Sequence, residues 1–134
     1  MKRLALAICV AASPALAQNF TTAAEVKPIL EATQANWLAL KEIDGVDYLY
    51  FTHLESWRCG LSQVAYAVND GALQTWEMEQ CYEETAAPNA MVEEGRVPLV
   101  TFPGGSVQKV VVSVALDDGE IMGKAFERKD IVLP

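Results

Sequence analysis

The sequence is poor in the residues that most often carry catalysis or bind metals. It contains one histidine, His53, and three cysteines in 134 residues. A Ser-His-Asp or Cys-His catalytic arrangement would have to use His53. A zinc site is not expected, because one histidine and cysteines better paired with each other leave too few ligands. A P-loop and an EF-hand are also missing, so we predict no cofactor and no metal.

Basic residues are few as well. Ten lysines and arginines stand against eighteen acidic residues, a formal net charge of −8. Nucleic acid binding needs a basic surface that displaces counterions from phosphates, and anionic membranes attract the same kind of surface. The sequence has no basic cluster, so we predict no nucleic acid partner. Most of the acidic residues are expected on a well-solvated surface.

No hydrophobic run is long enough to cross a bilayer, which takes about 20 apolar residues. The apolar run Leu4–Ala12 follows two basic residues and precedes Ser13–Ala17, which ends in an Ala-x-Ala pattern. This order is typical of a cleaved secretion signal. We therefore predict a signal peptide at 1–17, a single globular domain at 18–134, and a periplasmic or secreted bacterial protein without stable membrane insertion.

Removal of the signal leaves two cysteines, Cys59 and Cys81. An even pair in an exported protein indicates a disulfide bond. Eight basic and eighteen acidic residues then remain, so the formal charge becomes −10.

The domain is expected to begin with a helix. Thr22 and Glu25 fit a capping box, and apolar residues follow at helical spacing, which predicts a helix over about 22–35. Pro28 lies inside this pattern and predicts either a kink or a restart of the helix at that residue.

Strand-like sequence follows, and three Asp-Gly pairs divide it into hairpins. The predicted hairpins pair 37–42 with 46–53, 60–68 with 72–80, and 107–116 with 120–128. The connection 82–106 contains a short strand at 97–102, expected at a sheet edge because Pro98 cannot donate a hydrogen bond. We predict an α+β fold with the N-terminal helix packed on a mainly antiparallel sheet of six or seven strands. An immunoglobulin-like sandwich with an extra helix is the alternative.

The cysteines and the turn of the middle hairpin predict the same register. A three-residue loop at 69–71, with Gly71 in the left-handed conformation, pairs Val68 with Ala72. The same register places Cys59 directly opposite Cys81, within disulfide reach.

The first hairpin has two apolar faces. A two-residue turn pairs Ile43 with Val46 and gathers apolar residues on one face: Leu38, Leu40, Leu49 and Phe51. The other face carries Trp37, Tyr48 and Tyr50. These three aromatic side chains would form a stacking platform for a ligand if exposed, or part of the core if covered, and core is the favoured interpretation.

The segment 53–59, which joins the first two hairpins, is the best candidate for a binding site. It brings together His53, Trp57 and Arg58 beside the predicted disulfide, and tryptophan and arginine are frequent binding hot spots. The favoured interpretation is nevertheless structural: Trp57 covers the core beside the disulfide, and Arg58 pairs with a nearby acid such as Glu79 or Glu83.

These observations favour a non-enzymatic binding or protein-interaction module, with an envelope protein or a small ligand as partner. One alternative is a small periplasmic hydrolase that uses His53 or a pair of acids. The other is a structural envelope protein without a dedicated site.

Overall fold

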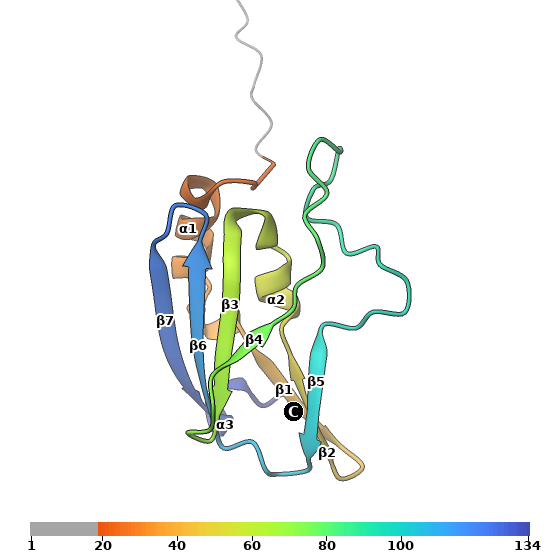
Figure 1. Ribbon diagram of the computed structural model, residues 1–134. Coiled ribbons are helices and arrows are strands. Elements are labelled where there is room, and N and C mark those ends of the chain that lie inside the picture. Colours follow the sequence, from red (N-terminus) through yellow and green to blue (C-terminus); the bar gives the residue numbers. More distant parts are fainter. Residues whose placement is uncertain (1–18) are drawn as a thin grey trace, which may run out of the picture.

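The computed structural model describes residues 19–134 (Figure 1). The predicted signal peptide at 1–17 lies outside the described residues. The elements follow one another as α1 (Ala23–Ala32), η1 (Gln34–Asn36), β1 (Ala39–Ile43), β2 (Val46–Tyr50), α2 (Thr52–Glu55), η2 (Arg58–Gly60), β3 (Leu61–Val68), β4 (Gln74–Trp76), β5 (Leu99–Pro103), β6 (Lys109–Leu116), β7 (Ile121–Glu127) and α3 (Arg128–Ile131).

Helix α1 begins at the predicted capping box. The Thr22 hydroxyl accepts a hydrogen bond from the Glu25 amide at 3.3 Å and donates one to the Glu25 carboxylate at 2.8 Å. The helix continues through Pro28 and ends at Ala32, three residues before the predicted end. The short 3₁₀ helix η1 follows, so Trp37 precedes β1 instead of lying in it.

The α+β prediction is confirmed, with an N-terminal helix and antiparallel sheets. The seven strands form two sheets instead of one, in the orders β1-β2-β5 and β4-β3-β6-β7. An immunoglobulin constant domain orders its seven strands 1-2-5-4 and 3-6-7. The strand order therefore corresponds to the predicted alternative, except that β4 pairs with β3 and not with β5.

The first and third hairpins have the predicted turns. Ile43 pairs with Val46 around Asp44-Gly45, and both turn residues have positive φ, as a type I′ turn requires. Ala115 pairs with Ile121 around the Asp118-Gly119 turn.

The middle hairpin has the predicted register but a different turn. Val64 pairs with Trp76, and the disulfide joins Cys59 to Cys81 with a Cα–Cα distance of 5.1 Å. The prediction of a left-handed Gly71 is wrong, because Asn69 and Asp70 take the positive φ values, 52° and 60°. Asparagine tolerates this conformation. Its side chain accepts hydrogen bonds here from the amides of Gln108, just before β6, and Lys109, the first residue of β6.

Two of the predicted strands are shorter in the structure by three residues or more. β4 contains three residues of the predicted 72–80, and β2 ends at Tyr50, because the chain turns into α2 at Thr52. The predicted edge strand at 97–102 forms as β5, which pairs with β2.

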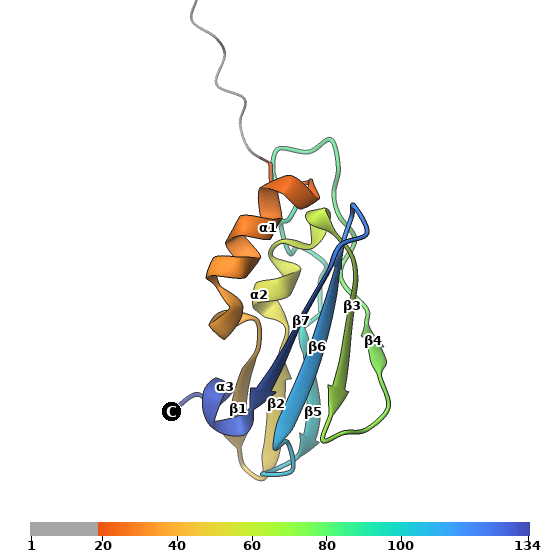
Figure 2. The ribbon, with the colours of Figure 1, turned by 90° about the vertical axis from the view of Figure 1, so that its left-hand side faces the viewer.

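One hydrophobic core joins the helices and both sheets. Helices α1 and α2 cover one end of the inner face of the four-stranded sheet, and β1 and β2 lie toward the other end (Figures 1 and 2). Phe51, directly after β2, stacks on Trp76 of β4 with ring centroids 4.3 Å apart. This contact links the two sheets beside α2, where the candidate site lies.

Candidate functional site

The segment predicted as a recognition loop is helical. Residues 52–55 form α2 and residues 58–60 form η2, so the polar side chains of the segment leave it in different directions. His53 contacts the end of α1, whereas Glu55 and Arg58 are buried.

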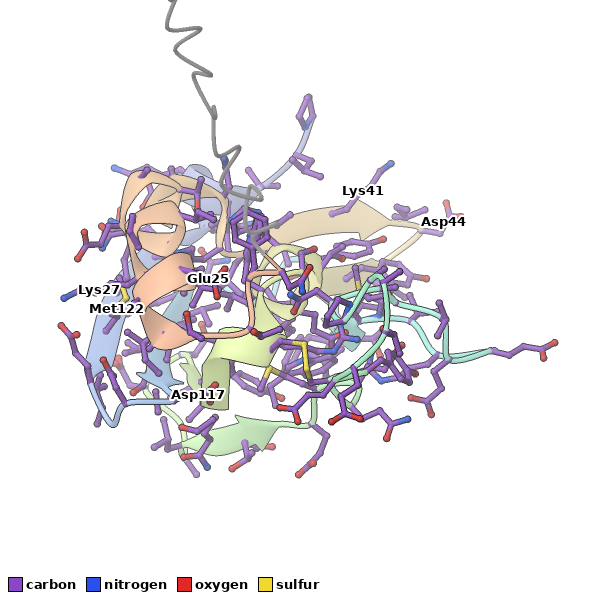
Figure 3. All side chains as sticks on the ribbon, turned by 90° about the horizontal axis from the view of Figure 1, so that it is seen from above. Glu25, Lys27, Lys41, Asp44, Asp117 and Met122 are labelled. Carbon is purple, nitrogen blue, oxygen red and sulfur yellow. A yellow bond between two sulfur atoms is a disulfide. The ribbon has the colours of Figure 1, made fainter. Side chains whose placement is uncertain are left out.

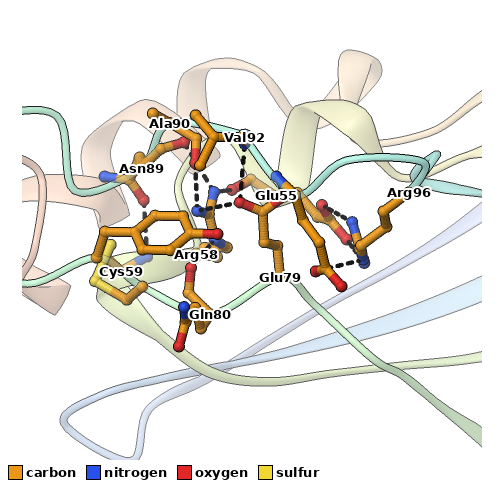
Figure 4. A network of polar contacts seen from close by, with 12 residues as sticks. Glu55, Arg58, Cys59, Glu79, Gln80, Asn89, Ala90, Val92 and Arg96 are labelled. Carbon is orange, nitrogen blue, oxygen red and sulfur yellow. Dashed lines mark hydrogen bonds and ion pairs between the residues drawn. A yellow bond between two sulfur atoms is a disulfide. The ribbon is translucent and has the colours of Figure 1, made fainter.

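Arg58 is a structural residue (Figure 4). Its guanidinium donates hydrogen bonds of 2.7–3.1 Å to the carbonyl oxygens of Glu55, Gln80, Asn89 and Ala90. It also forms an ion pair with the Glu79 carboxylate at 3.6 Å, which is one of the two predicted pairings. Since Arg58 is buried and its donors are used inside the protein, it offers no exposed contact.

Glu79 completes this cluster. Its carboxylate accepts hydrogen bonds from the amides of Val92 and Glu93, at 3.0 and 3.1 Å. Burial alone raises the pKa of Glu79, but the bonds from Val92, Tyr82 and Glu93 and the charge of Arg58 outweigh it. The pKa of Glu79 therefore lies below its ordinary value, and the carboxylate stays charged at neutral pH.

A second buried carboxylate, Glu55, binds the end of the long connection. It accepts a 2.8 Å hydrogen bond from the Trp76 indole and two from the Arg96 guanidinium, of which one measures 2.7 Å. Arg96 also donates to the carbonyl oxygen of Glu77 at 2.6 Å. Residue-type patterns did not reveal this arrangement, because Glu55 and Arg96 are 41 positions apart.

Trp57 packs at the N-terminal end of the domain. Its ring meets Phe20 edge-on at 5.1 Å and His53 at 6.4 Å. It is partly buried against the core, and its indole N–H is buried without a hydrogen-bond partner among residues 19–134. Trp57 and Arg58 therefore do not form one exposed surface.

Three other predicted residues do come together. Trp37, Tyr50 and His53 line an open hollow of about 510 Å³ between β1, β2 and α2. The rest of its lining is Asn36, Ala39, Lys41, Thr52, Ser56 and Leu133. Trp37 is fully buried and donates its indole N–H to the Leu30 carbonyl oxygen at 3.0 Å, so the favoured prediction of a core role is confirmed for it. Tyr48 is half-buried and does not line the hollow.

The hydrogen bonds of His53 determine its tautomer. The Thr33 hydroxyl donates to the Ile29 carbonyl oxygen at 2.6 Å, so it must accept from Nε2–H of His53, 2.8 Å away. Nδ1 has no partner among the described residues and is not buried. Burial of the ring lowers the pKa of His53. Neutral His53 therefore offers Nδ1 as a hydrogen-bond acceptor.

The hollow is mostly apolar and carries one charged side chain. Lys41 extends outward from β1 (Figure 3) and forms no ion pair among the described residues. No carboxylate lines the hollow in the described part of the chain. The site thus combines aromatic and aliphatic surface with the His53 acceptor, the Lys41 cation and the polar groups of Asn36, Thr52 and Ser56.

The serine in the lining of the hollow, Ser56, does not pair with His53. Ser56 donates its hydroxyl hydrogen to the Thr52 carbonyl oxygen at 2.9 Å. A serine nucleophile would donate to the histidine instead.

Residues 19–134 contain no cluster of three or more His, Cys, Asp or Glu side chains arranged to hold a metal ion. The helices of this part of the chain are all too short or too polar to span a membrane. Comparison with protein-family models, with curated proteins and with solved structures gives no match.

Proposed function

We propose that the protein is a small periplasmic or secreted binding module whose ligand occupies the hollow beside α2. The observation that carries the proposal is the open, mainly apolar hollow lined by Trp37, Tyr50 and His53. Ligand sites typically combine apolar surface with a few fixed polar groups, and this lining has that composition. We therefore assign the ligand contacts to Tyr50, His53 and Lys41 in place of Trp57 and Arg58.

The chemistry of the lining suggests the kind of ligand. A flat apolar group suits Tyr50 and the aliphatic residues beside it. A hydrogen-bond donor on the ligand suits Nδ1 of neutral His53, and an anionic tail suits Lys41. An aromatic or aliphatic acid with a polar N–H group combines these features.

Hydrolysis is the alternative use of the same hollow. The absence of a lining carboxylate among residues 19–134 and the bond from Ser56 to Thr52 favour binding over hydrolysis. A purely structural role predicts no ligand in the hollow.

Titration with a matched pair of probes tests the proposal. Indole-3-acetate and indole-3-acetamide have the same ring and N–H and differ in the charge of the tail. Amide chemical shifts in ¹H–¹⁵N spectra should move saturably at Ala39, Tyr50 and His53 with both probes. The acetate should bind about threefold more tightly, as one exposed ion pair allows.

Variants assign the contacts. Tyr50→Ala should weaken both probes, and Lys41→Gln should remove the preference for the acetate. Lys109→Gln removes a charge that does not line the hollow and should change neither. Shifts that map elsewhere, or equal binding to wild type and Tyr50→Ala, would contradict the proposal.

The proposed compartment has separate support. The disulfide is compatible with an oxidising compartment, and the order of residues 1–17 is typical of a secretion signal. Intact mass of the protein recovered from the periplasm of an expressing bacterium should correspond to a chain that begins at residue 18. Full-length protein retained in the cytoplasm would overturn this part of the proposal.

A further inference from the structure

The last strand, β7, is a sheet edge with free backbone groups. Leu116 donates its amide hydrogen to the Glu120 carbonyl oxygen, and Arg128 donates to that of Gln108. Hydrogen-bonded and non-hydrogen-bonded residue pairs alternate along an antiparallel ladder. The backbone amide and carbonyl groups of the even-numbered residues of β7 therefore point toward β6. The amide and carbonyl groups of Ile121, Gly123 and Ala125 therefore point away from the sheet. Their amides have no hydrogen-bond partner within residues 19–134.

The other sheet edges are protected. The last residues of the chain cover β1, since Val132 bridges to Leu40 and Leu133 donates to the Leu40 carbonyl oxygen at 2.8 Å. β4 is only three residues long. Pro98 directly precedes β5 and Pro103 is its last residue. Prolines and short length are usual ways to prevent strand addition at an edge.

β7 has neither of these protections, and Lys124 is the only charged side chain in its middle. It is seven residues long and contains no proline, and no bulge interrupts its register with β6. The edge faces the viewer uncovered in Figure 2. On the outer face of the sheet, Ile121 is 68% exposed. Beside it, Gly123 has no side chain and Ala125 has only a methyl group. An extended strand can therefore approach β7 along its length.

We propose that β7 pairs with β7 of a second copy of the chain, antiparallel about a two-fold axis, so that the two four-stranded sheets join. Two copies of the same strand related by a two-fold axis form an isologous contact. Each contact between a residue of one copy and a residue of the other therefore occurs twice. The proposal goes beyond the function proposed for the hollow and does not depend on it.

Hydrogen bonding and charge together favour one register. An axis at Lys124 would place this lysine directly opposite its own copy, which is unfavourable. An axis at Gly123 pairs Ile121 with Ala125 of the second copy and lets all three free residues exchange hydrogen bonds. It places Lys124 opposite Met122 of the second copy, with Glu120 of that copy on one diagonal and its Lys124 on the other. In the monomer Glu120 pairs with Lys27 at 2.6 Å, on the side of β7 where Lys27 and Met122 lie (Figure 3).

Proline at the axis is the sharpest test. The Gly123 amide points away from β6, so Gly123→Pro removes a donor that only the second copy would use. A Cβ at this position would meet its nearest atom outside neighbouring residues, the Val112 carbonyl oxygen, at 3.6 Å, which is an ordinary contact. Gly123→Ser is the matched control, because it adds a side chain and keeps the amide hydrogen.

Sedimentation equilibrium over about 10–500 μM protein covers the range expected for a small interface. Wild type and Gly123→Ser should show a reversible monomer–dimer equilibrium. Gly123→Pro should raise the dissociation constant about tenfold or more, because symmetry removes two hydrogen bonds at once. Circular dichroism should confirm that all three proteins are folded. A wild type that stays monomeric, or a dimer unchanged in Gly123→Pro, would overturn the proposal.

Cysteine substitutions test the register and remain decisive if the proline variant fails to fold. Gly123→Cys places two thiols opposite each other at the axis, within disulfide reach, and should give a covalent dimer on oxidation. Ala125→Cys places them about 13 Å apart along the strands and should stay uncrosslinked. Equal crosslinking of both variants would contradict the proposed axis.

Discussion

Glu55 stabilises the domain at the level of a single residue. It is fully buried, yet the Trp76 indole and the Arg96 guanidinium saturate its carboxylate. A buried charge is tolerated only when it is paired and hydrogen-bonded in this way. Glu55 and Trp76 thereby hold Arg96, near the end of the connection between β4 and β5, against α2.

Glu55→Gln should lower the free energy of unfolding by about 2–3 kcal/mol, because it weakens hydrogen bonds between charged groups and leaves the Arg96 charge without its main partner. Urea unfolding followed by tryptophan fluorescence measures the change. Glu93→Gln is the matched control, since Glu93 is largely exposed and lies 3.8 Å from Arg96. It should cost no more than about 0.5 kcal/mol. Equal losses in the two variants would show that the buried pair has no special weight.

His53 should titrate below its ordinary pKa of 6.5, because burial disfavours the charged ring. The unfolded chain then binds more protons than the folded one, so this group lowers stability as pH falls through 6.5 and leaves it unchanged above. Long-range ¹H–¹⁵N spectra should show the Nε2–H tautomer at pH 7.5. A pKa above 6.5, or an Nδ1–H tautomer, would remove the acceptor assigned to the hollow.

At the level of elements, the disulfide and the Arg58 cluster act on the same segment. Cys81 begins the connection that Arg58 holds through the carbonyl oxygens of Gln80 and Asn89. Cys59 is also bound through its amide, which donates to the Asn89 side chain at 2.9 Å. The segment is therefore attached to η2 by one covalent bond and by several hydrogen bonds.

Replacing both cysteines by serine should therefore loosen this segment without unfolding the domain. The double variant Cys59→Ser, Cys81→Ser should lose about 2–4 kcal/mol of stability, as expected for a loop of this size. Hydrogen exchange should accelerate mainly at residues 81–92, whereas the β6 amides stay protected. Exchange that accelerates equally throughout the domain would mean that the bond supports the entire fold.

The three hairpins were predictable because the residues that determine their pairing are close together in the sequence. The Asp44-Gly45 and Asp118-Gly119 turns fix their own pairings, and the cysteine spacing fixed the register of the middle hairpin. The left-handed residues of that turn were not predictable, because Asn69 is held by the distant start of β6. The predicted face of the first hairpin, with Leu40 and Leu49 inside, is confirmed for the same local reason.

The division into two sheets and the burial of Arg58 have long-range causes. Pairing of β2 with β5 and of β3 with β6 joins segments that share no turn. The carbonyl oxygens that bind Arg58 come from Asn89 and Ala90, which have no recognisable pattern because any residue supplies a carbonyl. For the site, the sequence identified Trp37, Tyr50 and His53 but could not show that they line one hollow.

At the level of the whole molecule, charge should oppose the proposed pairing of β7. Each copy carries a formal charge of −8, or −10 without residues 1–17, so two copies repel each other. Salt screens this repulsion, with a Debye length of about 10 Å at 0.1 M. The attraction between Lys124 and Glu120 of the second copy is also screened, but one exposed pair contributes at most about 1 kcal/mol.

The dissociation constant of the dimer should therefore fall, by about threefold or more, between roughly 20 and 500 mM sodium chloride. Sedimentation equilibrium at several salt concentrations measures the slope. The double variant Glu83→Gln, Glu84→Gln removes two exposed charges from the connection between β4 and β5, outside the β7 strand, and should make the slope shallower. A dimer that weakens with salt would instead show that cross-strand ion pairs dominate the contact, because net repulsion and specific pairing respond to screening with opposite sign.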